Sequence, residues 1–139
     1  MSADAHMMAR RSPAGRGDLA ELKRLHAAGT RFDYRSYMDA ALEGHLDVVK
    51  WLYSIDVPEC EDICYYAAEG GHGDILYWAL TQGCPITEAT CDNAACSGQF
   101  EILKLLRKWG IPWNRDFCLE ITRQHGRADM ASWIESQPN

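Results

Sequence analysis

Apolar residues recur along this chain with helical spacing, in short segments that resemble one another. Leu46, Val49, Leu52 and Tyr53 fall on one face of a helix. A glycine opens each such segment, and the opening glycines are 27, 27, 27 and 28 residues apart, at Gly17, Gly44, Gly71, Gly98 and Gly126. An internal period of this length predicts a stacked array of repeated units.

We number the positions of each copy from its opening glycine, which is slot 1. Slots 4 to 12 are predicted to form a helix, with an acidic residue in the first turn of four copies, where the helix dipole favours a carboxylate. A glycine at slot 13, replaced once by Asp56, supplies the left-handed residue that ends this helix, and proline at slot 15 prevents its resumption. Slots 18 to 26 are predicted to form a second, shorter helix, whose Ala pair at slots 24 and 25 allows close helix approach.

One copy cannot bury its apolar stripe alone, so the copies are expected to stack into an all-α solenoid. At 139 residues the chain is predicted to be one domain. We expect residues 1–16 to be a degenerate N-terminal cap or tail and residues 17–139 to form the array. The last helix is expected to be the C-terminal cap, because its polar side chains suit a face exposed to water: Ser132, Glu135, Ser136 and Gln137.

The composition is that of a water-soluble chain, with 47% hydrophobic and 24% charged residues. No segment approaches the ~20 apolar residues that cross a bilayer. The N-terminus lacks the apolar stretch of a secretion signal, so we expect an intracellular, cytoplasmic chain. The net charge of −6 combines +3 in residues 1–35 with −9 in residues 36–139. The acidic body argues against nucleic acid as a partner, and the basic end is interpreted as a solvated cap, with contact to an acidic partner as the alternative.

The cysteines are interpreted as packing residues. Cys64, Cys91 and Cys118 share slot 21 of successive copies. Neighbouring helices lie about 8–10 Å apart, whereas a disulfide needs Cα atoms within about 7 Å, so these three are predicted to be small buried residues. The alternative is a thiol-regulated or metal-binding module at Cys60 and Cys64, which are four residues apart.

Other conspicuous residues also repeat with the period. His45 and His72 occupy slot 2, and we expect each to form hydrogen bonds locally at the junction of two helices. Tryptophan recurs at slot 8, where packing is the expected role: Trp51, Trp78 and Trp133. Trp109 and Trp113 lie outside this row and are the better candidates for exposed contact residues.

Catalytic motifs are missing from the sequence. It contains no Gly-rich phosphate loop, no nucleophile elbow and no His-Glu-x-x-His. Acidic pairs such as Glu61-Asp62 stand at a predicted helix start, where capping explains them. We therefore expect a protein that is not an enzyme and that has no cofactor and no metal.

The phrase Gly-His-Leu-Asp-Val-Val-Lys-Trp-Leu, preceded by Ala-Ala-Leu-Glu (residues 40–52), resembles an ankyrin repeat. The resemblance covers residues 17–136 and implies paired helices in each copy. Ankyrin repeats usually have a period of about 33 residues and carry Thr-Pro-Leu-His, whereas this chain has a shorter period and lacks that motif. The protruding hairpin finger of the family is therefore expected to be trimmed to a short loop.

The segments Gly83–Cys91 and Gly110–Asn114 are similar to a variant ankyrin type that is frequent in large DNA viruses of protists, in algae and in oomycetes. This likeness implies a source of that kind. Viral ankyrin proteins often recruit host proteins to degradation through a C-terminal docking segment, and we expect no such segment after the last helix.

The family resemblance implies a protein-binding module that uses the concave face of the inner helices. On this chain the variable slots of that face are Tyr34, Asp39, Glu61, Tyr66, Glu69, Glu88, Asn93, Arg115, Glu120 and Arg123. The glutamates favour a basic or amphipathic protein partner, with no binding of nucleic acid or membrane, and we expect a monomer. The alternative is a structural or self-assembling subunit of a larger complex.

Overall fold

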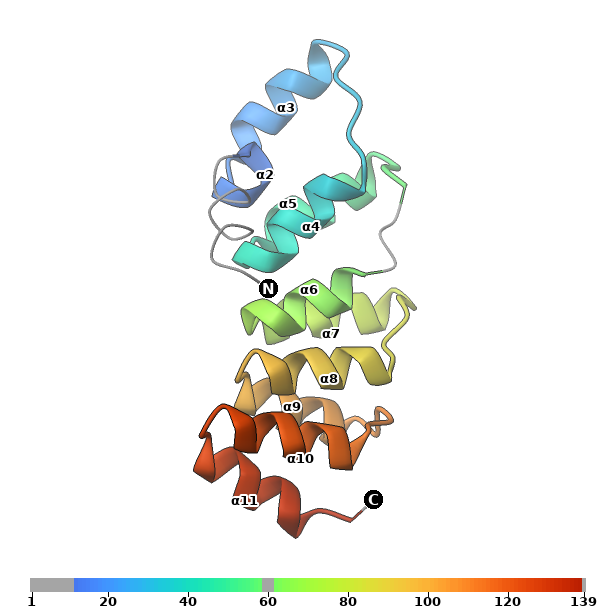
Figure 1. Ribbon diagram of the computed structural model, residues 1–139. Helices are drawn as coiled ribbons and strands as arrows, with labels where there is room; N and C mark the ends of the chain where they lie inside the picture. Colours follow the sequence, from blue (N-terminus) through green and yellow to red (C-terminus); the bar gives the residue numbers. More distant parts are fainter. Residues whose placement is uncertain (1–11, 59–61, 139) are drawn as a thin grey trace.

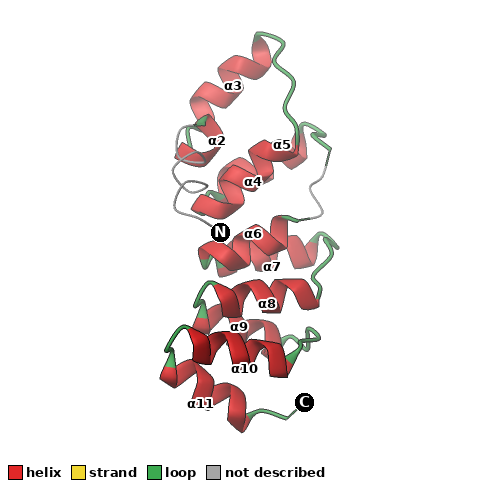
Figure 2. Ribbon diagram, viewed as in Figure 1, coloured by secondary structure: helices red, strands yellow, loops and turns green. Residues whose placement is uncertain are grey.

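The computed structural model describes residues 12–58 and 62–138, and all regular secondary structure in these residues is helical (Figures 1 and 2). Its helices, in chain order, are α2 (Pro13–Arg16), α3 (Leu19–Ala27), α4 (Tyr34–Glu43), α5 (Leu46–Ser54), α6 (Ile63–Gly70), α7 (Gly73–Thr81), α8 (Glu88–Cys96), α9 (Phe100–Lys108), α10 (Arg115–Gln124) and α11 (Ala128–Ser136). The copies stack in chain order from the N-terminal to the C-terminal end of the molecule (Figure 1). The chain is thus an all-α solenoid, as predicted.

The helices form two rows. The inner row consists of α4, α6, α8 and α10, which pack on one another in sequence, and α2 packs on α4 where an earlier inner helix would stand. The outer row consists of α3, α5, α7, α9 and α11, and each outer helix packs mainly on inner helices rather than on its neighbours in the outer row. Two faces therefore run the length of the array, one over each row.

Helix ends follow the predicted signals. Each outer helix covers slots 3 to 11, within one residue of the prediction. The slot-13 residues all have positive φ: 93° at Gly29, 59° at Asp56, 78° at Gly83 and 79° at Gly110. Asp56 is the non-glycine residue that adopts this conformation in the described part of the chain. The left-handed residue at slot 13 therefore ends the outer helix in every copy that has one.

Inner helices begin at polar capping residues. Asp33 accepts a hydrogen bond from the Arg35 amide at 2.9 Å at the start of α4. Thr87 and Thr90 form a capping box at the start of α8, and Asn114 accepts a bond from the Phe117 amide at the start of α10. These side chains satisfy amide groups that have no partner within the helix.

The core is built from the same slots in successive copies. On the outer helices α5, α7, α9 and α11, slots 5, 6 and 9 are buried, as at Val48, Val49 and Leu52. On the inner helices the Ala pairs are fully buried at Ala40–Ala41, Ala67–Ala68 and Ala94–Ala95. Cys64, Cys91 and Cys118 are also buried, with at most 1% exposed, which confirms the predicted packing role of slot 21. Small side chains at these slots allow the inner helices to stack closely.

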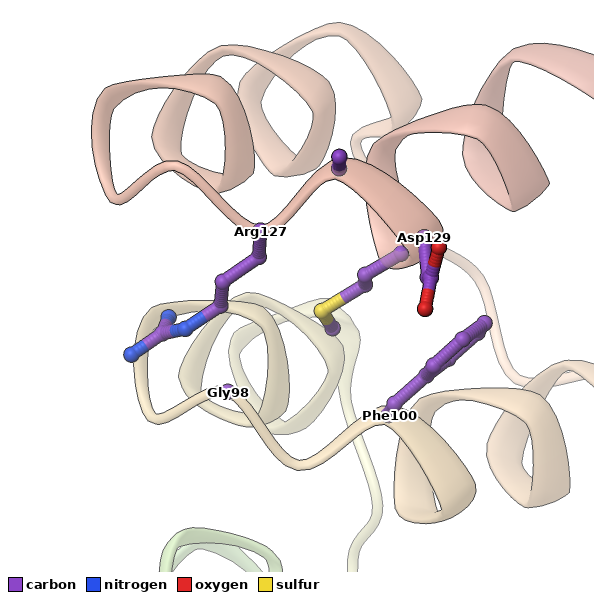
Figure 3. A pocket seen from close by; sticks show the side chains of 6 residues that line it. Gly98, Phe100, Arg127 and Asp129 are labelled. Atoms are coloured by element: carbon purple, nitrogen blue, oxygen red, sulfur yellow. The ribbon is translucent and has the colours of Figure 1, made fainter.

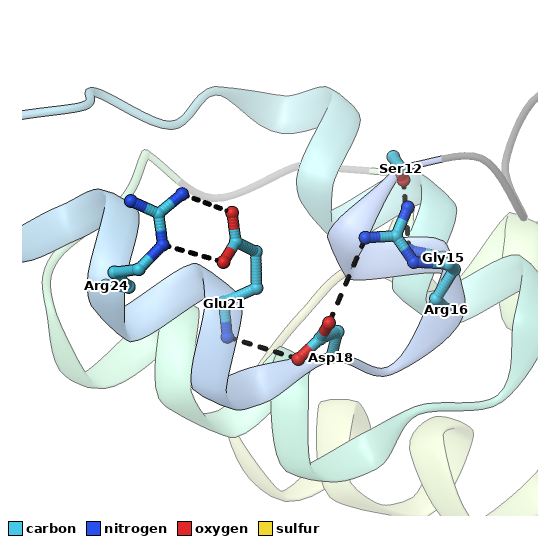
Figure 4. Close-up of polar contacts among 6 residues, drawn as sticks. All are labelled: Ser12, Gly15, Arg16, Asp18, Glu21 and Arg24. Atoms are coloured by element: carbon cyan, nitrogen blue, oxygen red, sulfur yellow. Dashed lines mark hydrogen bonds and ion pairs between the residues drawn. The ribbon is translucent and has the colours of Figure 1, made fainter.

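The N-terminal end is closed by a short helix and polar contacts (Figure 4). Ser12 caps α2 by accepting the Gly15 amide at 3.0 Å, and Asp18 caps α3 by accepting the Glu21 amide at 3.1 Å. Glu21 pairs with Arg24, and Asp18 lies 3.9 Å from Arg16. Residues 13–16 thus form a minimal helix, and the rest of the predicted cap, residues 1–11, lies outside the described residues.

The connections from outer to inner helices are short. The segments 28–33, 82–87 and 109–114 each join an outer helix to the next inner helix without a strand (Figure 2). A hairpin finger does not form in these connections. The trimmed loops leave the two helical faces as the extended surfaces of the described molecule.

Candidate partner-binding surfaces

Slot-2 side chains join each helix pair, which is an inner helix and the outer helix that follows it, to the preceding pair. His45 Nε2 lies 2.9 Å from the Gly15 carbonyl oxygen, and His72 Nε2 lies 3.0 Å from the Leu42 carbonyl oxygen. Each carbonyl belongs to the last turn of the preceding inner helix or, for Gly15, of α2. Since a carbonyl only accepts, each histidine donates from Nε2. The two histidines therefore bond between copies, which corrects the prediction of a local role.

The same bond forms with other residue types in later copies. Gln99 Nε2 donates to the Glu69 carbonyl oxygen at 2.9 Å. Arg127 Nη1 donates to the carbonyl oxygens of Ala95 and Cys96 at 3.2 and 3.1 Å. We call these interactions slot-2 bonds. They occupy carbonyl groups that a helix end leaves without an intrahelical partner.

The opening glycines lie beneath the slot-2 side chains. At Gly44 the backbone φ is 87°, and a Cβ atom placed there would stand 2.5 Å from Cε1 of His72. Gly17, Gly71 and Gly98 are covered in the same way by His45, Gln99 and Arg127. At Gly126, in the last copy, no atom lies within 4 Å of such a Cβ. In the earlier copies, slot 1 is thus glycine because its φ is positive and because a Cβ would collide with the slot-2 side chain. At Gly126 only the positive φ of 66° applies.

The inner-helix face presents a mixed set of the predicted binding residues. Four of them are exposed: Tyr34, with 52% of its surface accessible, Glu88, Glu120 and Arg123. Asp39, Tyr66 and Arg115 are half-buried. Glu61 lies outside the described residues. The exposed members come from α4, α8 and α10 and so extend along the inner row.

Two predicted binding residues lie inside the seam between copies. Glu69 and Asn93 are each 5% exposed. Asn93 Nδ2 donates to the Tyr65 carbonyl oxygen at 2.9 Å, so its amide joins α8 to α6. Little of either side chain is available to a partner. In these two copies the side chain lies at the contact with a neighbouring copy.

Three further predicted residues take part in contacts within the array. Asp39 accepts the Ser12 hydroxyl at 2.7 Å. Arg115 donates to the carbonyl oxygens of Gln137 and Glu135, each at 2.9 Å, and Arg123 pairs with the Glu135 carboxylate at 2.6 Å. The two arginines therefore attach α10 to the last turn of α11 and to Gln137, which follows it.

Two exposed aromatic residues on the inner helices were not among the predicted binding residues. Tyr65 on α6 is 36% exposed, and Phe117 on α10 is 38% exposed. Tyr65 stands at slot 22, whose residues Met38, Tyr65, Asp92 and Leu119 differ in every copy. That difference was the signal in the sequence that could have identified it.

Burial and negative charge act together at the inner face. Desolvation raises the pKa of Asp39 above its usual value, although the hydrogen bond from Ser12 lowers it. Desolvation also raises the pKa of Asp92, and it raises the pKa of Tyr65 with the nearby Glu69 charge as the next contribution. These shifts mark a partly dehydrated surface with an excess of carboxylates.

The tryptophans pack against the core. Trp51, Trp78 and Trp133 are partly buried, as expected. Trp109 and Trp113, expected to be exposed, are partly buried too. Trp113 lies under the Arg107 guanidinium, 4.8 Å from its ring centre, and 6.0 Å from the Trp133 ring.

A cavity of about 400 Å³ opens between the last two outer helices (Figure 3). Gly98, Phe100, Arg127, Asp129 and Met130 line it. The Arg127 side chain extends over the Gly98 turn, and Phe100 lies beside Asp129 (Figure 3). Because Arg127 bonds to carbonyl groups, this cavity is part of the seam between copies.

Two features of the described residues bear on other classes of function. Within residues 12–58 and 62–138, His, Cys, Asp and Glu side chains do not gather in a group of three that could hold a metal ion. Cys60, half of the alternative thiol or metal site, lies outside the described residues. In the same part of the chain, the helices are too short or too polar to cross a membrane.

The paired helices, their stacking and the slot-2 bonds define a helical-repeat protein. Residues 37–80, which cover α4 to α7, match the family model of ankyrin repeats in many copies. The same helix pair recurs on both sides of the match, so the described fold is consistent with an ankyrin-type array that extends beyond the matched residues. A search of curated proteins finds no match. Ankyrin repeats generally act as protein–protein interaction modules and are typically not enzymes.

Proposed function

We propose that this chain is a non-enzymatic module that binds a protein partner along the exposed inner-helix face. The observation that carries the proposal is that the core slots repeat while the exposed inner slots differ between copies. Tyr34, Tyr65, Glu88 and Glu120 are exposed on four successive inner helices, whereas the exposed Arg123 pairs with Glu135. Side chains that serve neither core nor seam are available for recognition.

The charge of this face favours a basic or amphipathic partner. Asp62, Glu88, Asp116 and Glu120 are exposed at or near the inner helices, and Asp92 is partly buried beside them. The exposed tyrosines on α4 and α6 add apolar contact area next to these carboxylates. A basic segment with apolar residues would find both kinds of contact.

The experiment reverses charge on each face in turn. Glu69 is unsuitable because Glu69→Lys would bury a charge, so the inner-face variant carries Glu88→Lys and Glu120→Lys. The matched control carries Asp74→Lys and Glu101→Lys, which reverse two exposed carboxylates of outer helices. Affinity capture from cell lysate should retain the same partner on wild type and control and lose it on the inner-face variant.

The capture is followed by direct titration of the identified partner. Circular dichroism of all three proteins should be the same, since the substituted residues are exposed. If the inner-face variant binds the partner as tightly as wild type does, the assignment of the face is wrong.

A second candidate function is self-assembly, and one observation favours it. Slot 20 is buried at Ile63 and Thr90, with 0% and 2% exposed, but the equivalent Phe117 is 38% exposed in the last inner helix. Ile121, which follows one turn later, is only partly buried. A second molecule could cover these apolar side chains. Light scattering at tens of micromolar tests this idea, and a monomer that is unchanged by Phe117→Ser removes it.

A further inference from the structure

The outer row carries its own exposed surface. On α5, α7, α9 and α11, slots 5, 6 and 9 face the core. Since successive helical residues are turned by about 100°, slot 7 points to the opposite side. Its residues, in chain order, are Lys23, Lys50, Tyr77, Lys104 and Ser132. Tyr77 is 60% exposed and interrupts a row of lysines.

Tyr77 lies in an apolar patch that is held in place by packing. Leu80 on α7 and Tyr53 on α5 are 38% and 41% exposed. The Tyr53 ring packs edge-on against Trp78 with centroids 5.4 Å apart, and the Tyr77 ring lies 6.3 Å from Trp109. We call the three exposed side chains Tyr53, Tyr77 and Leu80 the outer patch.

The size and composition of the outer patch suit protein recognition. With roughly 200 Å² for a whole aromatic side chain, the exposed parts of its two tyrosines amount to about 200 Å². Leu80 and the partly buried tryptophans add to this area. Apolar patches of a few hundred Å² often mark interaction sites, and tyrosine is enriched among the residues that dominate binding energy.

Basic side chains flank the outer patch on both sides. Lys50 is exposed on α5, and Lys104 and Lys108 stand on α9. Together with Arg107 and Trp133, these two α9 lysines line a cavity of about 290 Å³ near the end of the chain. The cavity has room for an acidic side chain, which would meet positive charge there.

Other charged groups restrict where a partner can lie. Asp47, Asp74 and Glu101 stand at slot 4, one turn nearer the helix N-termini than slot 7. Lys104 already pairs with Glu101 at 3.1 Å and lies 4.1 Å above the Phe100 ring. The surface over α5, α7 and α9 is therefore basic and apolar in the C-terminal halves of these three helices only.

We propose that the C-terminal halves of α5, α7 and α9 bind an amphipathic helix of a partner protein, with apolar residues that contact the outer patch and acidic residues that contact the flanking lysines. Neighbouring helices are about 10 Å apart, and a helix rises ~1.5 Å per residue. The acidic residues should thus stand about seven residues before and after the apolar contact. This surface lies opposite the inner-helix face, so it does not rest on the function proposed above.

The experiment selects ligands on the folded chain and then identifies where they bind. A displayed library of 20-residue helices is selected on wild type, and enriched peptides are synthesised and measured by fluorescence anisotropy. The outer-patch variant carries Tyr77→Ser and Leu80→Ser, and the flank variant carries Lys50→Glu and Lys108→Glu. The inner-face variant, Glu88→Lys with Glu120→Lys, is the matched control.

The proposal expects apolar residues flanked by Asp or Glu at a spacing of about seven. Binding should weaken at least tenfold in the outer-patch variant and in the flank variant, and stay unchanged in the inner-face variant. The proposal is overturned if no peptide is enriched, or if enriched peptides bind the outer-patch variant normally or depend on the inner face. Association of wild type with itself or with anionic lipid vesicles, lost in the outer-patch variant, would assign the surface to a different occupant and overturn it too.

Discussion

Gly44→Ala tests whether the opening glycine is required by its neighbour as well as by its own backbone. An alanine at φ 87° is strained, at a cost of about 1–2 kcal/mol. In addition, its Cβ would stand 2.5 Å from His72 Cε1. Carbon atoms at ordinary contact are about 3.5 Å apart, so the imidazole would have to move by about 1 Å.

Such a displacement of the imidazole breaks a slot-2 bond. The His72 Nε2 atom is 3.0 Å from the Leu42 oxygen, and at about 4 Å no hydrogen bond remains. The lost bond adds about 0.5–1.5 kcal/mol. We expect Gly44→Ala to lower the free energy of unfolding by about 1.5–3.5 kcal/mol, from the backbone strain and the lost bond together.

Two controls separate these contributions. Gly83→Ala has the same backbone strain, with φ 78°, but no atom within 4 Å of the added carbon, so it should cost only the ~1–2 kcal/mol of strain. In a His72→Ala background the collision disappears. Gly44→Ala should then also cost about 1–2 kcal/mol, which makes the two substitutions non-additive.

Urea unfolding followed by circular dichroism and tryptophan fluorescence measures all four variants. The dependence on urea concentration should have the same slope in each, so that midpoints report stability. This account of slot 1 would be refuted if Gly44→Ala and Gly83→Ala lowered the free energy of unfolding equally. It would also be refuted if the effects of Gly44→Ala and His72→Ala were additive in the double variant.

Three further expectations concern stability. Burial raises the pKa of Cys91 from 9.0 to about 12, so the free energy of unfolding should fall as pH rises from 9 towards 12, where only the unfolded thiol ionises; urea midpoints between pH 8 and 11 should fall less in Cys91→Ala. Asn93→Leu removes the 2.9 Å bond to the Tyr65 carbonyl and should cost about 1–3 kcal/mol in the same assay, and a neutral result would contradict a role in the seam. Glu135→Gln breaks an exposed pair with Arg123 and should change the thermal midpoint very little, since such pairs contribute below ~1 kcal/mol.

Much of the fold could be predicted because each helix end is encoded locally. Positive φ at Gly29, Asp56, Gly83 and Gly110 ends the outer helices, and that conformation depends mainly on the residue itself. Burial of Cys64, Cys91 and Cys118 could also be predicted, because the period places them at one slot and helix spacing excludes a bridge between them. In both cases a local or periodic constraint was sufficient.

The slot-2 bonds could not be predicted in full. His45 and its acceptor Gly15 are 30 residues apart, and nothing in either segment alone indicates the contact. Gln99 and Arg127 replace histidine because the position needs a side-chain N–H that reaches back to the preceding helix end, and several residue types provide one. A comparison of the copies by residue type alone therefore does not show that the slot-2 histidines, Gln99 and Arg127 form equivalent bonds.

Candidate binding residues were only partly predictable for a related reason. Asn93 and Glu69 vary between copies, yet each is 5% exposed. In their own copies these two side chains lie at the seam, where a residue needs to suit only the neighbouring copy. Variation in a repeat array thus has two sources, contact with the next copy and contact with a partner, and a sequence without a structure does not separate them.

The structure separates the two sources by elimination. Core slots keep the same kind of residue, and seam slots are occupied by bonds between copies. The slots that remain point outward on one of the two faces, and there an unusual residue is not explained by packing. Tyr77 satisfies this condition, because the equivalent positions in three other copies are lysines and because its ring is 60% exposed. The Tyr77 ring contacts Trp109 but leaves most of its surface in water, which costs solubility. The proposed recognition of a partner is the physical reason that accounts for this exposure.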